Sequence, residues 1–247
     1  MSYYYLTPLK TSTGFTDVHS INLIGSSSQA INLGQSGVIF KSTNAYTYSL
    51  WFNTSSSAVM LLLTAGLTGT EPTGPGFLVM FGGGMGALAS DSNGYSLTAT
   101  GGGNIYADGN WHQATVTFNG GTGASAQLVL YVDGQLLASS TPNPNFTTLY
   151  IDDTQTDYIG QSQSGQYFTG YVDSFVVLEG TLLNSTQVME LYNGGVFKSP
   201  LTMSFHNYVT NWFPMGEGSD NSTTIYDTVG GLSGTLINSP TYSTNIP

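Results

Sequence analysis

The sequence of 247 residues contains no cysteine and no arginine, and its only cations are Lys10, Lys41 and Lys198. The absence of cysteine excludes disulfides and thiolate metal sites, so the fold must be held by packing. Against three cations stand 14 acids, which gives a formal net charge of -11. Nucleic-acid binding needs many Lys or Arg contacts to phosphate, and an anionic membrane would repel such a chain. We therefore expect neither nucleic acid nor a membrane as a partner.

Long apolar runs are also missing, since no segment approaches the roughly 18 consecutive apolar residues of a membrane-spanning helix. The opening stretch MSYYYLTPLKTSTGF lacks the charged region followed by an apolar run that marks a secretory signal. We expect a soluble chain that is made in a cytoplasm without such a signal. With 40% hydrophobic residues, one large domain with a substantial core is our expectation.

What the sequence has in abundance is two-residue alternation punctuated by 32 glycines. Residues 46–52 carry apolar side chains on both faces, which predicts a central strand. Residues 112–118 alternate apolar residues with Gln and Thr, which predicts a half-buried strand with a hydroxyl-rich outer face. The apolar run 128–132 is followed by Asp133-Gly134, a pair typical of a type I′ turn, and then by a partner strand at 135–138.

Further strands are predicted at 58–63, 76–81, 95–100, 157–160 and 171–178, separated by clusters of Gly, Ser, Thr, Pro and Asn. This spacing indicates an all-β sandwich or jelly roll of two antiparallel sheets. One short helix is predicted at 185–193, because Asn184 can cap it, Gln187 completes a capping box and Gly194 ends it.

Five segments in a fixed order resemble a known family: YSLWFNTSS, ADGNWHQATVTF, LVLYVDGQLLAS, DYIGQS and FTGYVDSFVVLEGTLLNSTQVMELYNGG. This order is similar to the concanavalin A-like lectin/glucanase domain in its laminin G-like form, over about residues 28–195. The resemblance implies a two-sheet jelly-roll core at 28–195. The residues around it would be an N-terminal arm, 1–20, and a C-terminal segment, 207–247, within one domain.

The C-terminal segment 207–247 resembles the stretch that usually opens such a domain, here placed after the helix. That arrangement is similar to predicted virion proteins of tailed phages. We expect Trp212, Tyr226 and Leu236 to pack this segment back on the sandwich or to extend it. The arm Tyr3 to Leu9 and the end Tyr242 to Pro247 would then contact other subunits.

Catalytic chemistry has little support in the sequence. A glucanase of this fold needs two carboxylates on one strand, and Glu71, Glu179, Glu190 and Glu217 have no acid two residues away on a predicted strand. His19, His112 and His206 are scattered, and we expect His112 to be a packed strand residue bonded to backbone groups. The loops 64–76 and 101–108 are the candidate rims of a binding pocket.

The family resemblance implies a structural Ca²⁺, held by the Asp of the late V-D strand, Asp173, with Asp227 and Glu217 from the C-terminal segment. Hard oxygen ligands suit Ca²⁺. The alternative is that Asp173 only accepts backbone hydrogen bonds.

Three functions remain open. The first is a non-enzymatic virion surface protein of a bacteriophage, a capsid decoration or fibre component that forms homo-oligomers or binds other virion proteins. The second is a carbohydrate-binding lectin module that attaches to surface glycans, which is compatible with the first. The third, least favoured, is a glucanase-type glycoside hydrolase.

Overall fold

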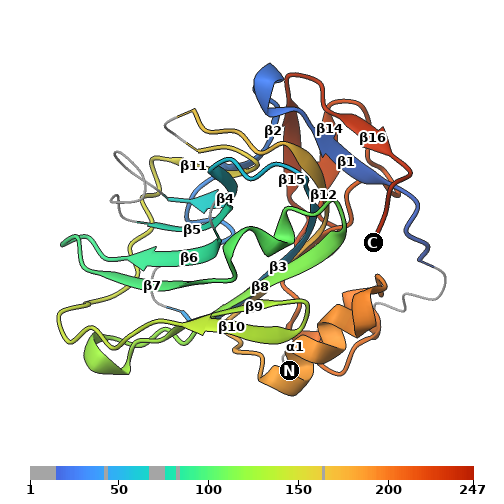
Figure 1. Cartoon of the computed structure of the whole chain (residues 1–247). Helices are drawn as coiled ribbons and strands as arrows, with labels where there is room; N and C mark the ends of the chain where they lie inside the picture. The colour runs from blue at the N-terminus through green and yellow to red at the C-terminus, as the bar shows by residue number, and fades with distance from the viewer. Residues whose placement is uncertain (1–14, 42–43, 67–75, 82–83, 163–164) are drawn as a thin grey trace, which may run out of the picture.

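The strands form two antiparallel eight-stranded sheets, which confirms the predicted all-β sandwich (Figure 1). The computed structural model describes residues 15–41, 44–66, 76–81, 84–162 and 165–247. Sheet A has the order β10 (Gln135–Ser139), β9 (Leu128–Val132), β8 (Trp111–Phe118), β3 (Tyr46–Asn53), β12 (Gly170–Glu179), β1 (Ser20–Leu23) and β16 (Thr241–Ser243), and β13 (Asn211–Phe213) also pairs with β12.

Sheet B has the order β14 (Thr224–Tyr226), β15 (Ser233–Ile237), β2 (Ala30–Gln35), β11 (Thr156–Ile159), β4 (Met60–Ala65), β5 (Gly76–Phe81), β6 (Met85–Ser90) and β7 (Ser96–Gly101). The helix α1 spans Ser185–Tyr192. Short 3₁₀ turns lie at Gly25–Ser27, Gly103–Tyr106, Gly123–Ser125, Asn193–Gly195, Pro200–Thr202 and His206–Tyr208. No helix in the described ranges is long and apolar enough to cross a membrane.

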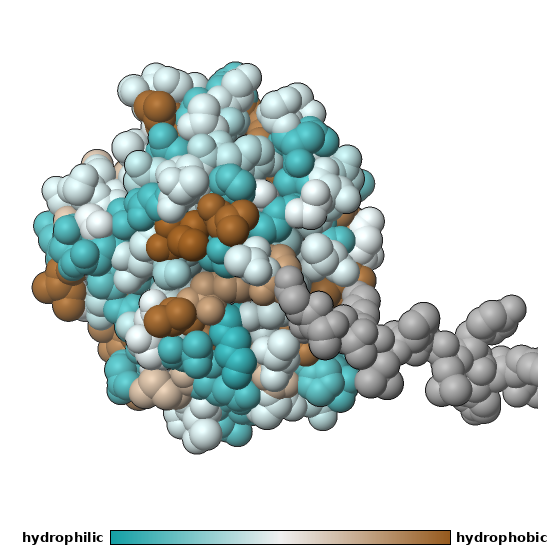
Figure 2. Space-filling view, turned by 90° about the vertical axis from the view of Figure 1, so that its right-hand side faces the viewer, coloured by the Kyte–Doolittle hydropathy of each residue, from teal (hydrophilic) through white to brown (hydrophobic). Residues whose placement is uncertain are grey.

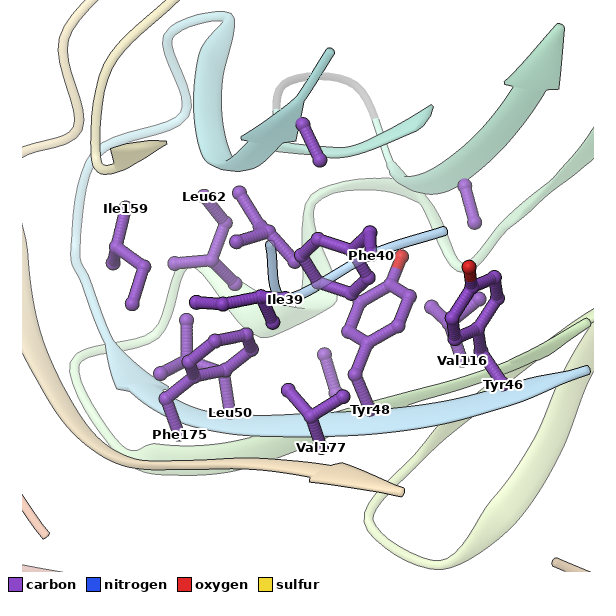
Figure 3. Packing of buried hydrophobic residues seen from close by; sticks show 14 of the residues in the cluster. Ile39, Phe40, Tyr46, Tyr48, Leu50, Leu62, Val116, Ile159, Phe175 and Val177 are labelled. Carbon is purple, nitrogen blue, oxygen red and sulfur yellow. The ribbon is translucent and has the colours of Figure 1, made fainter. Parts of the chain in front are cut away.

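The main core fills the space between the two sheets. Tyr46, Tyr48 and Leu50 point from β3 into this space (Figure 3). The ring of Phe40 meets those of Tyr46 and Tyr48 edge-on, at centroid distances of 5.9 and 5.7 Å. Each large side chain that is buried in this way contributes on the order of 1.5–3 kcal/mol. The prediction that 46–52 is central is confirmed, because β3 is buried along its whole length.

The prediction that β8 is only half-buried, with an outer face open to solvent, is wrong. Gln113, Thr115 and Thr117 are only 1%, 1% and 2% exposed. The reason is a second, smaller hydrophobic cluster on the outer face of sheet A, where α1 packs through Val188 and Leu191. The polar groups under this cover find partners, since the Gln113 amide donates to the Leu191 carbonyl at 3.3 Å.

The predicted helix and hairpin turn are confirmed in detail. Asn184 accepts a hydrogen bond from Gln187 N at 3.0 Å, and the Gln187 side chain accepts one from Asn184 N at 3.1 Å. This reciprocal pair satisfies two backbone donors at the start of α1. Asp133 and Gly134 have φ angles of 53° and 73°, as a type I′ turn requires.

The segment 207–247 contributes strands to both sheets. β13 pairs with β12, β16 pairs with β1, and β15 pairs with β2 and carries β14 at the sheet edge. Trp212 is 2% exposed and Leu236 7%, whereas Tyr226 is 38% exposed. The predicted arm contacts of Tyr3 to Leu9 lie outside the described residues.

A buried carboxylate cluster on the outer face of sheet A

Strand β12 changes its neighbour halfway along its length, and the candidate site lies at that change. Its first half pairs with β1 from Gly170 to Val172, and its second half pairs with β13 from Phe175 to Val177. Asp173 and Ser174 stand between the two pairings. Ser174 has a φ of 45°, and the register with β3 shifts here as well. The bulge therefore interrupts the strand pairing beside Asp173.

Acids from both ends of the chain lie near this interruption. Asp17 lies just before β1, and Glu217 follows β13 by four residues. Glu217 is held in place because its Oε1 accepts hydrogen bonds from Val18 N at 3.0 Å and His19 N at 2.8 Å. Asp17, Asp173 and Glu217 are called the carboxylate cluster below.

Most oxygens of the carboxylate cluster have no hydrogen-bond donor. Both carboxylate oxygens of Asp17, both of Asp173 and Oε2 of Glu217 are buried without a partner. Buried polar atoms are normally paired, and an unpaired charge in the interior is costly. Among the residues that the structure describes, these unpaired oxygens are therefore an unusual feature.

The environment of the cluster favours the protonated acids. Burial, and next the charge of Glu217, raises the pKa of Asp17 to about 7. Burial, followed by the charges of Asp17 and Glu217, raises the pKa of Asp173 well above its ordinary value. Burial also raises the pKa of Glu217. The charge of Glu217 thus disfavours the ionised form of Asp17, and the charges of Asp17 and Glu217 disfavour the ionised form of Asp173.

The turn that carries Glu217 depends on a glycine. Gly216 has a φ of +133°, and a Cβ there would lie 2.5 Å from the Cβ of His19. Only glycine allows this close approach of the two segments. On the other side of the bulge, Trp212 Nε1 donates to Ser174 Oγ at 3.0 Å, so the Trp212 ring ties β13 to the bulge.

Asp227, the third predicted calcium ligand, already has a complete set of partners. Its Oδ1 accepts from the backbone N of Trp212, Val229 and Gly230, at 2.9, 2.8 and 2.9 Å. Its Oδ2 accepts from the Asn211 amide at 2.7 Å. These bonds fix the turn after β14, and they leave Asp227 little capacity for a metal.

The charge of Glu217 reaches both Asp17 and Asp173 and raises their pKa values, but the three acids do not converge as a preformed metal site. Within the described ranges, no three His, Asp or Glu side chains already stand in a metal-holding arrangement. The donor chemistry nevertheless fits a hard cation, because five buried carboxylate oxygens lack any other partner. A cation would require these side chains to close inward.

Two hollows open beside the cluster on the same face of the molecule. One of about 420 Å³ is lined by Asp17 together with Phe15, Phe197 and Ser199, and one of about 500 Å³ is lined by Glu217, His19 and Pro214. Figure 2 views the molecule from the side where the C-terminus lies in Figure 1, and apolar side chains gather around a hollow in that face.

The other predicted candidates lie elsewhere. His112 contacts carboxylates and not backbone, with Nδ1 2.7 Å from Asp133 Oδ2 and Nε2 3.1 Å from Asp108 Oδ1. His206 Nδ1 bonds the Met203 carbonyl at 2.8 Å.

The acids that were considered for a glucanase, and the predicted rims of a binding pocket, also lie away from the cluster or outside the described residues. Glu179 pairs with Lys41 at 3.0 Å, and Glu190 accepts from Ser204 N at 2.7 Å. Glu71 lies outside the described residues, as does most of the predicted rim 64–76. The rim 101–108 contains the 3₁₀ turn Gly103–Tyr106.

Sequence reasoning missed Asp17. The only sequence feature that could have indicated Asp17 is its position shortly before a segment of alternating polar and apolar residues, Ser20 to Leu23. It lies far from Asp173 and Glu217 in the sequence, and only the pairing of β1 with β12 brings it to them.

The architecture is that of a two-sheet lectin-like sandwich, and the sequence comparison agrees. The family model described as the concanavalin A-like lectin/glucanases superfamily matches residues 25–189, so the chain belongs to this superfamily. Among curated proteins, no sequence matches the chain significantly.

Solved structures share the fold at low sequence identity. A Bacteroides ovatus protein with a proposed carbohydrate-binding role has a TM-score of 0.61 at 15% identity, covering 94% of this chain and 62% of that one. The chain thus spans less than two thirds of the length of that relative. The CBM40 module of a Ruminococcus gnavus sialidase has a TM-score of 0.50 at 14% identity, covering 72% of this chain and 99% of the module. Because the sequence identities are this low, the similarity of these structures shows only that the fold is shared.

Proposed function

We propose that this chain is a non-catalytic carbohydrate-binding module whose carboxylate cluster binds a Ca²⁺ ion. Support for the ligand class comes from membership of a lectin/glucanase superfamily and from the carbohydrate-binding description of the similar Bacteroides ovatus protein. This part is an analogy between folds. The observation that carries the proposal is the set of unpaired buried oxygens in the cluster.

Calcium is the cation that suits these groups. Its 6–8 ligands are oxygens, and its flexible coordination tolerates carboxylates from separate segments. Asp17, Asp173 and Glu217 would supply the ligands, and the ion would offset three mutually repelling charges. Because these residues join the segments before β1 and after β13 to β12, the ion would stabilise the fold and would set the shape of the neighbouring surface.

Binding without catalysis is favoured by the burial of the same acids. A glycosidase needs one acid and one nucleophile or base on either side of an accessible sugar. The oxygens of Asp17 and Asp173 are inaccessible to water, so a sugar would not reach them. A role in holding a cation fits this burial better.

The carbohydrate part is tested with an array of neutral and acidic glycans, probed with purified protein in the presence of 1–2 mM Ca²⁺ (on the order of weak extracellular sites). Saturable binding to a defined group of glycans is expected. Release of free sugar from those glycans would overturn the non-catalytic reading, and binding to no glycan would overturn the carbohydrate reading.

The calcium part is tested by titration calorimetry with Ca²⁺ alone. The wild-type protein should bind one equivalent, and Asp173→Asn should lose most of this affinity because a charged ligand is removed. Asp153→Asn is the matched control, since Asp153 is an exposed acid elsewhere on the molecule. Equal binding by wild type and Asp173→Asn would place any Ca²⁺ outside the cluster.

The virion setting stays a prediction of the sequence. Attachment to a virus particle, assembly with copies of the chain and location on a particle surface rest on the similarity of 207–247 to phage virion proteins. A glycan-binding module on such a surface would be compatible with the proposed function.

A further inference from the structure

Residues 244–247, called the strap below, cross the outer face of sheet A beside the carboxylate cluster. Ser20 Oγ on β1 donates to the Asn245 carbonyl at 2.6 Å, and Trp111 Nε1 on β8 donates to the Asn245 side-chain oxygen at 3.1 Å. In the order of the sheet, β12 and β3 lie between β1 and β8. The two contacts of Asn245 therefore reach across both of these strands.

The strap lies on the same face of sheet A as Asp173. Successive side chains of a strand point to opposite faces of the sheet. Ile21 and Val172 point into the main core, so their chain neighbours Ser20 and Asp173 point outward. Asp173 is on β12, one of the two strands that the contacts of Asn245 span.

The far end of the strap reaches another member of the cluster. Its last two residues line the hollow of about 420 Å³ together with Asp17. Phe15 and Phe197 also line this hollow, and their ring centroids lie 4.7 and 6.3 Å from that of Trp212. This aromatic wall is fixed by ring packing, whereas the strap forms a wall of a different kind.

The strap is held by few contacts. β16 ends at Ser243, so the strap has no strand pairing, and Thr244 and Asn245 are exposed. Within the ranges that the structure describes, the hydrogen bonds of the strap to other elements are the two that Asn245 makes, to Ser20 and Trp111. A segment with few buried contacts and exposed hydrogen bonds opens at a low free energy.

The acids beside the strap are closed to solvent. The side-chain oxygens of Asp17 and Asp173 are buried, so a cation from solution can reach them only after part of their cover moves. The aromatic wall would have to break its ring packing to do so. The strap has to break only two hydrogen bonds, and it is therefore the cover that opens most easily.

We propose that the strap is a lid that must lift before a cation enters the carboxylate cluster and that closes again over the bound ion. This inference rests on the proposed Ca²⁺ binding and adds the route by which the ion enters. Because the lid is closed both before and after binding, a weaker attachment should speed entry and release by the same factor. The Kd for Ca²⁺ should then stay unchanged.

The kinetic test measures Ca²⁺ release by stopped-flow mixing with a fluorescent chelator, and the Kd by titration calorimetry with Ca²⁺ alone. Asn245→Ala removes the oxygen that accepts from Trp111, and Trp111→Phe keeps an aromatic ring but removes the donor. Each variant loses one hydrogen bond, so the release rate, and the association rate obtained from it and the Kd, should both rise about two- to tenfold.

Two further variants separate the lid from general effects of substitution. The double variant with Asn245→Ala and Trp111→Phe should be no faster than the faster single variant, because both substitutions break the same bond. Thr244→Ala changes an exposed strap residue outside the two hydrogen bonds and should behave like wild type. Thermal unfolding of each variant checks that it is folded.

A second measurement needs no calcium. The NMR order parameters of the Asn245 and Ile246 amides should be lower in Trp111→Phe than in the wild type, because the strap has lost one of its two attachments. Order parameters that are equal in the two proteins would overturn the lid, since Trp111 would then not hold the strap.

The outcomes separate this inference from the proposed function. Ca²⁺ binding by the wild type with unchanged release rates in Asn245→Ala and Trp111→Phe would overturn the lid and leave the calcium function standing. Faster release with a weaker Kd and an unchanged association rate would also overturn it, because Asn245 would then act on the bound ion and not on its entry. A wild type that binds no Ca²⁺ would overturn the calcium function, and the lid with it.

Discussion

Gly134 occupies a position that excludes other residues for two independent reasons. Its φ is +73°, and a Cβ would lie 2.8 Å from Met189 Sδ and 3.1 Å from Tyr192 Cβ on α1. Gly134→Val should therefore destabilise the protein by about 1–3 kcal/mol for the backbone and further for crowding. Gly94→Val is the matched control, since Gly94 has a φ of +85° in open space. Urea unfolding should show the larger loss for Gly134→Val; equal losses would mean that contact with α1 is unimportant.

His112 is a residue whose contribution depends on pH. Burial lowers its pKa, but the hydrogen bond and charge of Asp133, with those of Asp108, outweigh burial and raise the pKa overall. Tyr106 and Phe52 also face the ring, at 5.1 and 5.8 Å, and neither carries a charge there. The stabilisation is therefore fully present below the unfolded pKa of about 6.5 and is lost as pH rises through the raised folded pKa.

The measurement for His112 is the unfolding free energy of wild type and His112→Asn from pH 5.5 to 9. The advantage of the wild type should be largest at the acidic end and should shrink as pH rises. An advantage that is constant with pH would mean that the ring packs without its charge.

The residues of the candidate site were only partly predictable. Asp173 and Glu217 could be found because each lies in a segment with a family resemblance. Asp17 could not, because its role depends on which strand β1 pairs with. Asp227 is an acid in a recognisable segment too, but the backbone donors that surround it appear only when the turn is built.

At the scale of elements, the cap of α1 gives a direct prediction. Asn184→Ala removes the side chain that accepts from Gln187 N and should cost about 1 kcal/mol of stability. The exposed neighbour Thr186 makes no part of the capping box, so Thr186→Ala should be neutral or slightly stabilising. Thermal unfolding of the two variants checks this, and similar effects would argue against the cap.

Strands were predictable where large apolar side chains alternate along the chain or form a continuous run. β3, β9 and β12 were found within one or two residues. β6 was missed, because its six residues, MGALAS, are buried but mostly small, so they show neither alternation nor a run of large apolar side chains. β1 and β2 were also missed, since both are short and include Asn or Gly, and their partners lie far away in the sequence.

At the scale of the whole molecule, the cluster joins three distant segments. Asp17 precedes β1, Asp173 lies in β12 and Glu217 follows β13, so their mutual repulsion opposes the pairing of both chain ends with sheet A. A net charge of -11 with three cations provides few opposite charges to relieve it. The protonation state of the cluster should therefore influence global stability and not only local structure.

Without calcium, the unfolding temperature should fall as pH rises from about 4 to about 8. The folded pKa of Asp17 is about 7 against an ordinary value of 3.8, and that of Asp173 is also raised. A raised pKa means stabilisation that is complete below the unfolded pKa and lost as pH rises through the folded value. Asp173→Asn should make this fall smaller. Because the variant leaves His112 unchanged, the difference from wild type measures the contribution of the cluster and not that of His112.

Because Ca²⁺ binds the ionised acids, its addition should stabilise the wild type more at pH 8 than at pH 5. A calcium-free profile that is flat with pH, and equal in wild type and Asp173→Asn, would show that the cluster acids do not repel one another in the folded protein.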